Sequence, residues 1–360
     1  MSRKPNKVRC GVLGAMLCGV CWCALASVPV PEVGDAARRS ALISNQLGQS
    51  VLLGAGVTAT DRLVAVGERG LVLLSDDGGT QWHQAKVPVS VSLTAVKFAG
   101  QQGVAVGHGG VVLTSQDNGE TWALRLDGRR AAELALQSAK ASHNDAQIEN
   151  AQRLVDEGPD KPFLDVAIDA QGRVLIVGAY GMMFASTDMG QNWSAWLDRL
   201  DNPDGLHLYA IRQRGHELLV AGERGLVLHS ANDGATFERL ITPYKGSLFT
   251  AELSGDNDII VAGLKGSLLR SHDDGASWHS FSAKDASSFT GSTLGANGTV
   301  YLVNQGGQVF GLPPSGLQAL NVQAMPPLNA IVSLDSDRVV VLSNTGLTSL
   351  SLEPRAGGLK

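Results

Sequence analysis

The chain has 360 residues, hydrophobic residues at 44% and a net charge of −5, so its length allows one large domain or two ordinary ones. The acidic balance disfavours a nucleic-acid partner and an anionic membrane surface. Many glycines (43) beside few aromatic residues (5%) indicate many turns and an all-β chain.

The first 26 residues differ from the rest. They begin with four basic residues and continue without a charge from residue 11 to residue 25, ending in Ala24-Leu25-Ala26. This pattern predicts a signal peptide over residues 1–26 and an exported protein, periplasmic or secreted. The alternative is a retained membrane anchor, for which the uncharged run is shorter than the roughly 20 residues of a spanning helix.

All four cysteines fall in this segment, at positions 10, 18, 21 and 23. The mature chain is therefore expected to form no disulfide and no thiolate metal site. Its histidines show no H-x-H or H-E-x-x-H spacing, so no metal site and no other cofactor is predicted.

From residue 64 onward the chain repeats one pattern. The anchor residues are Gly67, Gly107, Gly178, Gly222, Gly263 and, in two weaker copies, Asn304 and Ser343. Their period is about 41 residues once an insertion at 127–160 is set aside. The five clearer copies hold an apolar run, a G-x-x-G turn, a second apolar run and a turn of the type S-x-D-x-G-x-x-W, one of them as a variant.

A repeat of this length with four short strands is the size of a propeller blade. We therefore predict an all-β fold: a seven-bladed β-propeller over residues 27–360, with Asp-box turns and a helical insertion between blades 2 and 3. A β-helix or a sandwich is the alternative, but neither usually has this period. The last blade lacks a fourth strand, which a segment near Ala37–Ile43 is expected to supply.

The S-x-D-x-G-x-x-W turns are interpreted as structural Asp boxes, because their Ser and Asp side chains can accept backbone N–H groups. Their residues are Ser75, Asp77, Gly79 and Trp82; Ser115, Asp117, Gly119 and Trp122; Ser186, Asp188, Gly190 and Trp193; and Ser271, Asp273, Gly275 and Trp278. A variant copy stands at Ser230, Asn232, Gly234 and Phe237.

The insertion is rich in Ala, Leu, Gln and Glu, which favours helix. His143-Asn144-Asp145 interrupts it, so it is either one helix or a hairpin of two. Leu134, Leu136, Ile148, Leu154 and Val155 are expected to form a modest apolar stripe.

The G-x-x-G turns and the links between blades share one face of the predicted propeller, opposite the Asp boxes. Loops on a rigid scaffold often carry binding residues, and Arg and Tyr are enriched at binding hot spots. The predicted binding residues are Arg69, His108, Tyr180, Arg224, Lys265, His207, Tyr209 and Tyr244. The alternative is that these are solvated turns, with Glu68-Arg69 and Glu223-Arg224 as local ion pairs.

At these motifs the chain resembles the photosystem II assembly and stability factor propellers of cyanobacteria and chloroplasts, from about residue 50 to 320. The resemblance implies a seven-bladed propeller that binds a newly made membrane protein through an arginine-rich face, without catalysis. Arg69 and Arg224 match that tendency and Lys265 stands at the equivalent turn, whereas His108 and Tyr180 depart from it.

The rival class is a glycoside hydrolase, because sialidase-type propellers also carry Asp boxes. Sialidase chemistry needs three arginines, a tyrosine nucleophile and an acid near the axis, and no Arg-Ile-Pro tripeptide precedes the first box here. A two-carboxylate glycosidase using Asp165, Asp201 or Asp204 stays open. We therefore expect a non-enzymatic scaffold that binds a protein client and aids assembly of a membrane complex or transporter; a glycan-binding module is a third possibility.

Overall fold

The computed structural model describes residues 35–44, 47–283, 285–320, 323 and 325–352. The chain divides into two units, residues 1–34 and residues 35–360. The second unit has the following fold. The predicted signal peptide and its cysteines lie outside the described residues. Among the described helices, none is long and apolar enough to span a bilayer.

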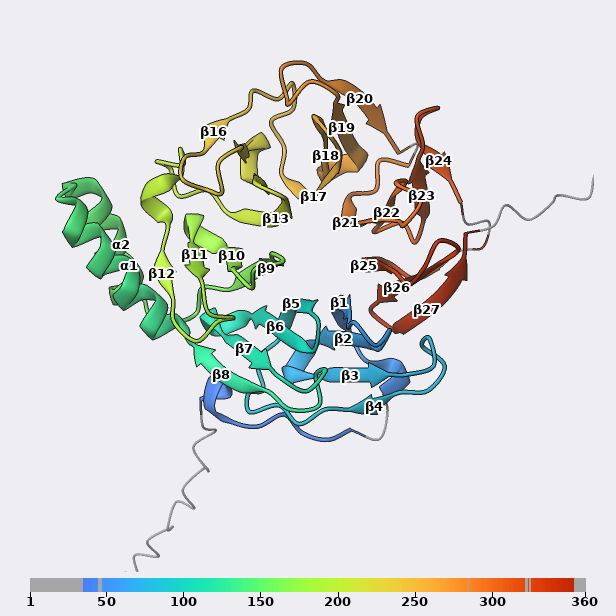
Figure 1. The fold of residues 1–360 in the computed structure, drawn as a ribbon, viewed down its shortest axis with the longest axis horizontal. Coiled ribbons are helices and arrows are strands. Elements are labelled where there is room, and N and C mark those ends of the chain that lie inside the picture. The colour runs from blue at the N-terminus through green and yellow to red at the C-terminus, as the bar shows by residue number, and fades with distance from the viewer. Residues whose placement is uncertain (1–34, 45–46, 284, 321–322, 324, 353–360) are drawn as a thin grey trace, which may run out of the picture. The chain divides into compact units, whose positions relative to one another are not determined.

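Residues 52–351 form seven antiparallel sheets, each built from strands that are consecutive in the sequence. Six sheets have four strands and the seventh has three. The first strand of each sheet contacts the first strand of the next, and that of sheet seven contacts that of sheet one. The sheets therefore form a closed ring with their first strands around the centre (Figure 1).

The strands have these bounds in sheets one to four. Sheet one holds β1 (Leu52–Val57), β2 (Leu63–Gly67), β3 (Val72–Ser75) and β4 (His83–Gln84). Sheet two holds β5 (Leu93–Ala99), β6 (Gln102–Gly107), β7 (Val112–Ser115) and β8 (Ala123–Leu126). Sheet three holds β9 (Phe163–Ile168), β10 (Val174–Gly178), β11 (Met183–Ser186) and β12 (Ser194–Ala195). Sheet four holds β13 (Leu208–Arg214), β14 (Glu217–Gly222), β15 (Val227–Ser230) and β16 (Glu238–Arg239).

The remaining sheets follow the same order. Sheet five holds β17 (Leu248–Gly255), β18 (Asp258–Gly263), β19 (Ser267–Ser271) and β20 (His279–Ser282). Sheet six holds β21 (Phe289–Leu294), β22 (Val300–Asn304), β23 (Val309–Leu312) and β24 (Gln318–Ala319). Sheet seven holds β25 (Leu328–Ser333), β26 (Arg338–Ser343) and β27 (Gly346–Ser351).

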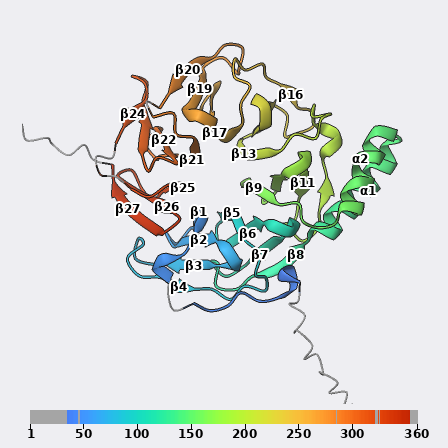
Figure 2. The ribbon, with the colours of Figure 1, turned by 180° about the vertical axis from the view of Figure 1, so that it is seen from behind.

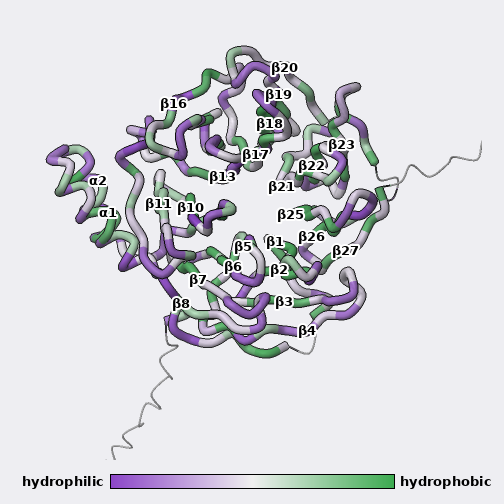
Figure 3. Tube along the Cα trace, viewed as in Figure 1, coloured by the Kyte–Doolittle hydropathy of each residue, from purple (hydrophilic) through white to green (hydrophobic). Residues whose placement is uncertain are grey.

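The core lies between neighbouring sheets. Every residue of β2, β10 and β18 is buried, because an adjacent sheet covers each face of a second strand. This explains why these strands are continuous apolar runs rather than alternating ones. In Figure 3 the hydrophobic stretches coincide mainly with the strands and the hydrophilic ones mainly with the connecting loops.

The S-x-D-x-G-x-x-W turns join the third strand of a sheet to its fourth. In sheet one, Ser75 Oγ accepts from the Gly79 N–H at 2.9 Å, and Asp77 Oδ1 accepts from Ser75 Oγ at 2.9 Å. Trp82 Nε1 donates to the Gly79 carbonyl at 2.9 Å. The same serine and aspartate bonds recur at Ser115, Ser186 and Ser271. At Ser230, Asn232 takes the place of the aspartate.

Substituting Asp273 by Asn is expected to remove a pH dependence of stability without breaking its turn. Hydrogen bonds from the Ser277 hydroxyl and N–H, and from Ser271, lower the pKa of Asp273 from 3.8 to about 2. Because the folded pKa is depressed, this carboxylate stabilises the fold above pH 3.8 and loses its contribution as the pH falls toward 2. Asn232 already serves as acceptor in the equivalent turn. Thermal unfolding should show the midpoints of the wild type and of Asp273→Asn converging as the pH falls from 5 to 2. A constant difference between the two midpoints over this range would contradict the prediction.

The G-x-x-G turns are single 3-10 turns with left-handed backbone. Arg69, Tyr180, Arg224 and Lys265 have φ of 54–57°, and Gly109 takes this place in sheet two at 68°. The first glycine is required for a different reason. A Cβ on Gly67 would lie 2.1 Å from the Val51 carbonyl oxygen, so close backbone approach, rather than positive φ, excludes other residues there.

The prediction that a segment near Ala37–Ile43 supplies a fourth strand to sheet seven is wrong. Residues 36–43 instead run beside the link that follows β4: the Ala41 N–H donates to Val87 O at 3.0 Å and the Ser90 N–H to Ala36 O at 2.8 Å. Sheet seven packs against sheet one and so closes the ring. Asn329 Nδ2 also donates a hydrogen bond of 2.9 Å to Leu52 O. The short turn η2 (Leu47–Gln49) contacts β27.

The insertion forms two helices, α1 (Gly128–Ser142) and α2 (Asp145–Glu157). Asp127 caps α1 by accepting the Arg130 N–H at 3.0 Å, and Asn144 caps α2 by accepting the Gln147 N–H at 3.1 Å. His143, with φ of 54°, makes the break between them. Alanines form most of the buried stripe, with Leu154; the other four predicted hydrophobics are only partly buried. Figures 1 and 2 show both helices outside the ring, beside sheet three.

Candidate functional site

Each first strand carries a bulge at its second residue, next to a G-x-x-G turn. The pairing shifts between Leu208 and Ala210 in β13 and between Leu248 and Thr250 in β17, and the other first strands shift at the same place. Bulges re-aim side chains and are common beside binding sites. The seven skipped residues, named here the bulge ring, are Leu53, Thr94, Leu164, Tyr209, Phe249, Thr290 and Asn329.

The polar members of the bulge ring fasten neighbouring sheets. Thr94 Oγ1 donates to Phe163 O at 2.8 Å, and Thr290 Oγ1 donates to Leu328 O at 2.7 Å. Asn329 makes the same link to β1. These side chains are engaged within the fold, whereas Leu164, Tyr209 and Phe249 present apolar or aromatic surface.

Aromatic rings form a continuous strip across sheets three to five. Tyr180 and His207 have ring centroids 5.1 Å apart, His207 and Tyr209 6.2 Å, and Tyr209 and Phe249 5.1 Å. We call these four residues the aromatic strip. The Tyr180 N–H donates to His207 Nδ1 at 3.1 Å, which orients the imidazole. Burial raises the pKa of the Tyr209 phenol, so its hydroxyl stays protonated at neutral pH.

A cation lies at one end of the strip. Lys161 Nζ lies 5.5 Å from the centre of the Tyr180 ring, within the range of a cation–π contact. The Lys161 side chain is buried and pairs with Glu157 at 3.2 Å and with Asp160. Burial lowers the pKa of this ammonium, but the two carboxylate hydrogen bonds outweigh it and leave the pKa raised. Lys161 is therefore a fixed positive charge beneath Tyr180.

Of the predicted binding residues, the structure brings together Tyr180, His207 and Tyr209. Tyr244 lies in the link between sheets four and five and donates its hydroxyl to Leu264 O at 2.7 Å. Arg69, Arg224 and Lys265 occupy one equivalent place in three turns, and their side chains are exposed. His108 is also exposed but stands one position earlier in its turn.

The local Glu–Arg pairs of the alternative interpretation do not form: among the described ion pairs, none joins Glu68 to Arg69 or Glu223 to Arg224. Neighbouring side chains of a left-handed turn diverge, and Glu223 Oε2 instead accepts the His207 N–H at 3.3 Å. Both arginines are therefore available to a partner.

A groove of about 350 Å³ adjoins Tyr180. Its helical wall includes Ala135, Ala139 and Leu154 from α1 and α2, and its other wall is the segment 197–205. Asp198, Asp201 and Asp204 line that second wall, so two of the carboxylates considered for glycosidase chemistry lie in this groove, whereas Asp165 belongs to another cluster.

A charged cluster occupies the centre of the ring. Arg212 Nη1 contacts Asp165 Oδ2 at 2.6 Å, and its Nε contacts Glu252 Oε1 at 3.2 Å. Burial opposes the charge of Arg212, but the charges of Glu252 and Asp165 and their hydrogen bonds raise its pKa. Burial, with a smaller contribution from Arg212, lowers the pKa of Lys97 nearby. A sialidase needs three arginines here; this cluster has one, already paired with two carboxylates.

Sequence reasoning missed Phe249, Lys161 and, apart from Asp165, the members of this central cluster. Phe249 had a usable signal, since it occupies the same place in its repeat as Tyr209. Lys161 carried no such signal, because it follows the insertion and has no counterpart in the other repeats.

A closed ring of antiparallel sheets, six of them four-stranded and one three-stranded, is a β-propeller. The chain belongs to the family described as photosynthesis system II assembly factor YCF48, whose model matches residues 46–142 and 144–247. The resemblance stated from the motifs is thereby confirmed.

Solved structures share the fold at low sequence identity. A structure described as YCF48 bound to D1 peptide is 15% identical, with a TM-score of 0.63 over 87% of this chain and 99% of that one. YCF48 from Cyanidioschyzon merolae is 14% identical, with a TM-score of 0.62 over the same shares. The WD40 propeller domain of Doa1 is 11% identical, with a TM-score of 0.59 over 86% and 96%. No curated protein matches the sequence.

Proposed function

We propose that this protein is a non-enzymatic scaffold that binds a segment of a protein client at the mouth of its ring and aids assembly or stability of a membrane complex. The observation that carries the proposal is the aromatic strip, which joins three sheets beside exposed turn arginines and a groove. Tyr and Arg provide most of the energy at many protein interfaces. A family relative has been seen with a bound peptide, which supports a peptide-like ligand.

The proposal also covers the architecture of the protein and its location in the cell. We propose a seven-bladed propeller over residues 27–360, in which Asp-box turns stabilise the outer strands and the opposite face recognises the client. The N-terminal charge pattern supports cleavage after Ala26 and export. Among the described residues, the central cluster holds one arginine, paired with two carboxylates, which favours this scaffold over a sialidase.

The proposal is tested by photo-crosslinking in living cells. A benzoylphenylalanine placed at Tyr180 or Tyr209 is expected to form an adduct with one and the same envelope protein. The mass of the crosslinked chain should match a mature protein that starts at Ser27. The control position is His279, an exposed ring on the outer strand β20, which should give no such adduct. Adducts shared by all three positions, or none at the two tyrosines, would refute the proposed surface.

A further inference from the structure

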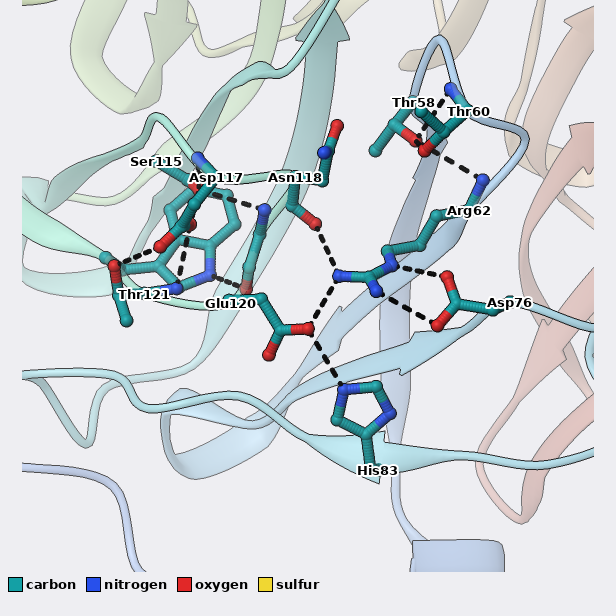
Figure 4. Close-up of polar contacts among 12 residues, drawn as sticks. Thr58, Thr60, Arg62, Asp76, His83, Ser115, Asp117, Asn118, Glu120 and Thr121 are labelled. Atoms are coloured by element: carbon teal, nitrogen blue, oxygen red, sulfur yellow. Dashed lines mark hydrogen bonds and ion pairs between the residues drawn. The ribbon is translucent and has the colours of Figure 1, made fainter.

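Two of the joints between neighbouring sheets, meaning the contacts of one sheet's second strand with the S-x-D-x-G-x-x-W turn of the next, share an electrostatic pattern. In sheet one, Arg62 stands before β2 and contacts Asp76 of its own sheet at 2.6 Å. It also reaches sheet two, where it contacts Glu120 at 2.7 Å and the Asn118 carbonyl at 3.5 Å (Figure 4). In sheet three, Arg173 stands before β10 and contacts Asp233 of sheet four at 3.0 Å. At both joints an arginine carries positive charge to the turn of the next sheet.

The joint between sheets four and five has no such arginine. Glu217 occupies the place of Arg62 and Arg173, since Leu218 pairs with Ser230 just as Leu63 pairs with Ser75. Asp274 occupies the place of Asn118 and Asp233 in the next turn. Glu217, Asp274 and His229 each place one ligand atom within 4.8 Å of the other two. Two carboxylates thus meet where the two joints described above place an arginine.

Sheet five shows how a carboxylate at this place is otherwise neutralised. There Asp258 takes the place of Glu217, and Arg270 takes the place of His229. Arg270 Nε and Nη2 donate to the two oxygens of Asp258 at 2.9 and 2.8 Å. In sheet four the imidazole of His229 replaces the guanidinium, and its Nε2 is buried with no hydrogen-bond partner among the described residues. A buried, unpartnered ring nitrogen is an independent sign that a partner is missing.

We propose that Glu217, His229 and Asp274 bind a divalent transition-metal ion, Zn²⁺, which joins sheets four and five as Arg62 and Arg173 join theirs. One imidazole and two carboxylates are a donor set that suits Zn²⁺. The Asp274 side is exposed, which leaves a fourth position for water. The ligands come from β14, β15 and the turn of the next sheet, so they show none of the close histidine spacings by which such sites are recognised in a sequence.

The test is a zinc titration of the purified full-length chain after treatment with EDTA. Binding to the folded state raises the unfolding midpoint, increasingly with zinc concentration. We expect this rise in the wild type and its loss in Glu217→Gln and His229→Gln. Equilibrium dialysis should find one zinc equivalent fewer in each variant. The matched control His272→Gln removes an exposed histidine that pairs with Asp258, and it should keep both effects.

Glu217→Gln keeps the size of the side chain, so it remains informative if His229→Gln folds poorly. Equal zinc binding and an equal rise in midpoint in Glu217→Gln and wild type would overturn the proposal. So would a wild-type unfolding midpoint that does not change with the zinc concentration.

Discussion

Replacing Arg212 by methionine is expected to lower the free energy of unfolding by about 3–5 kcal/mol, because it leaves two buried carboxylates without their common cation. The side chains of Asp165 and Glu252 are 12% and 8% exposed, and Arg212 bridges them at the centre of the ring. Asp165 belongs to sheet three and Glu252 to sheet five, so the loss should affect the whole ring. Denaturant unfolding followed by tryptophan fluorescence measures the change.

Arg214 provides the matched control, two residues along the same strand. It pairs with Asp256 at 2.9 Å, but these side chains are 43% and 94% exposed. Arg214→Met should therefore cost no more than about 1 kcal/mol. Similar losses in the two variants would show that burial does not decide the contribution of the central arginine.

The Gly225→Ala variant is expected to lose about 2–5 kcal/mol of stability, from two separate causes. Gly225 has a φ of 74°, where a side chain costs about 1–2 kcal/mol. An added Cβ would also lie 2.0 Å from the Tyr244 carbonyl oxygen, and such overpacking costs about 1–3 kcal/mol. The turn of sheet four and the link carrying Tyr244 would have to separate. Thermal and denaturant unfolding report the loss.

Gly215→Ala separates the two causes. Gly215 has a φ of 59°, yet a Cβ there would meet nothing within 4 Å, so only the backbone cost of about 1–2 kcal/mol applies. The difference between the two variants measures the close approach at the G-x-x-G turn. If Gly215→Ala is as destabilising as Gly225→Ala, the predicted contact with Tyr244 O is not what requires the glycine.

The sequence by itself determined the repeat, its strands and turns, and the interrupted insertion. These features are local: each strand is an apolar run, and each turn is specified by residues within a few positions of one another, as Ser75, Asp77 and Gly79 are. Repeats that contact only their neighbours let such local signals predict a whole architecture. The family resemblance rested on the same short motifs.

The tertiary structure alone decided which side chains meet. Lys97, Asp165, Arg212 and Glu252 come from four different repeats and converge only because the ring closes. The aromatic strip likewise depends on bulges that turn Tyr209 and Phe249 toward the mouth, and no local motif marks a bulge. Residues 36–43 illustrate the limit: the need to close the ring suggested a strand there, but hydrogen bonds to a distant link decided where they lie.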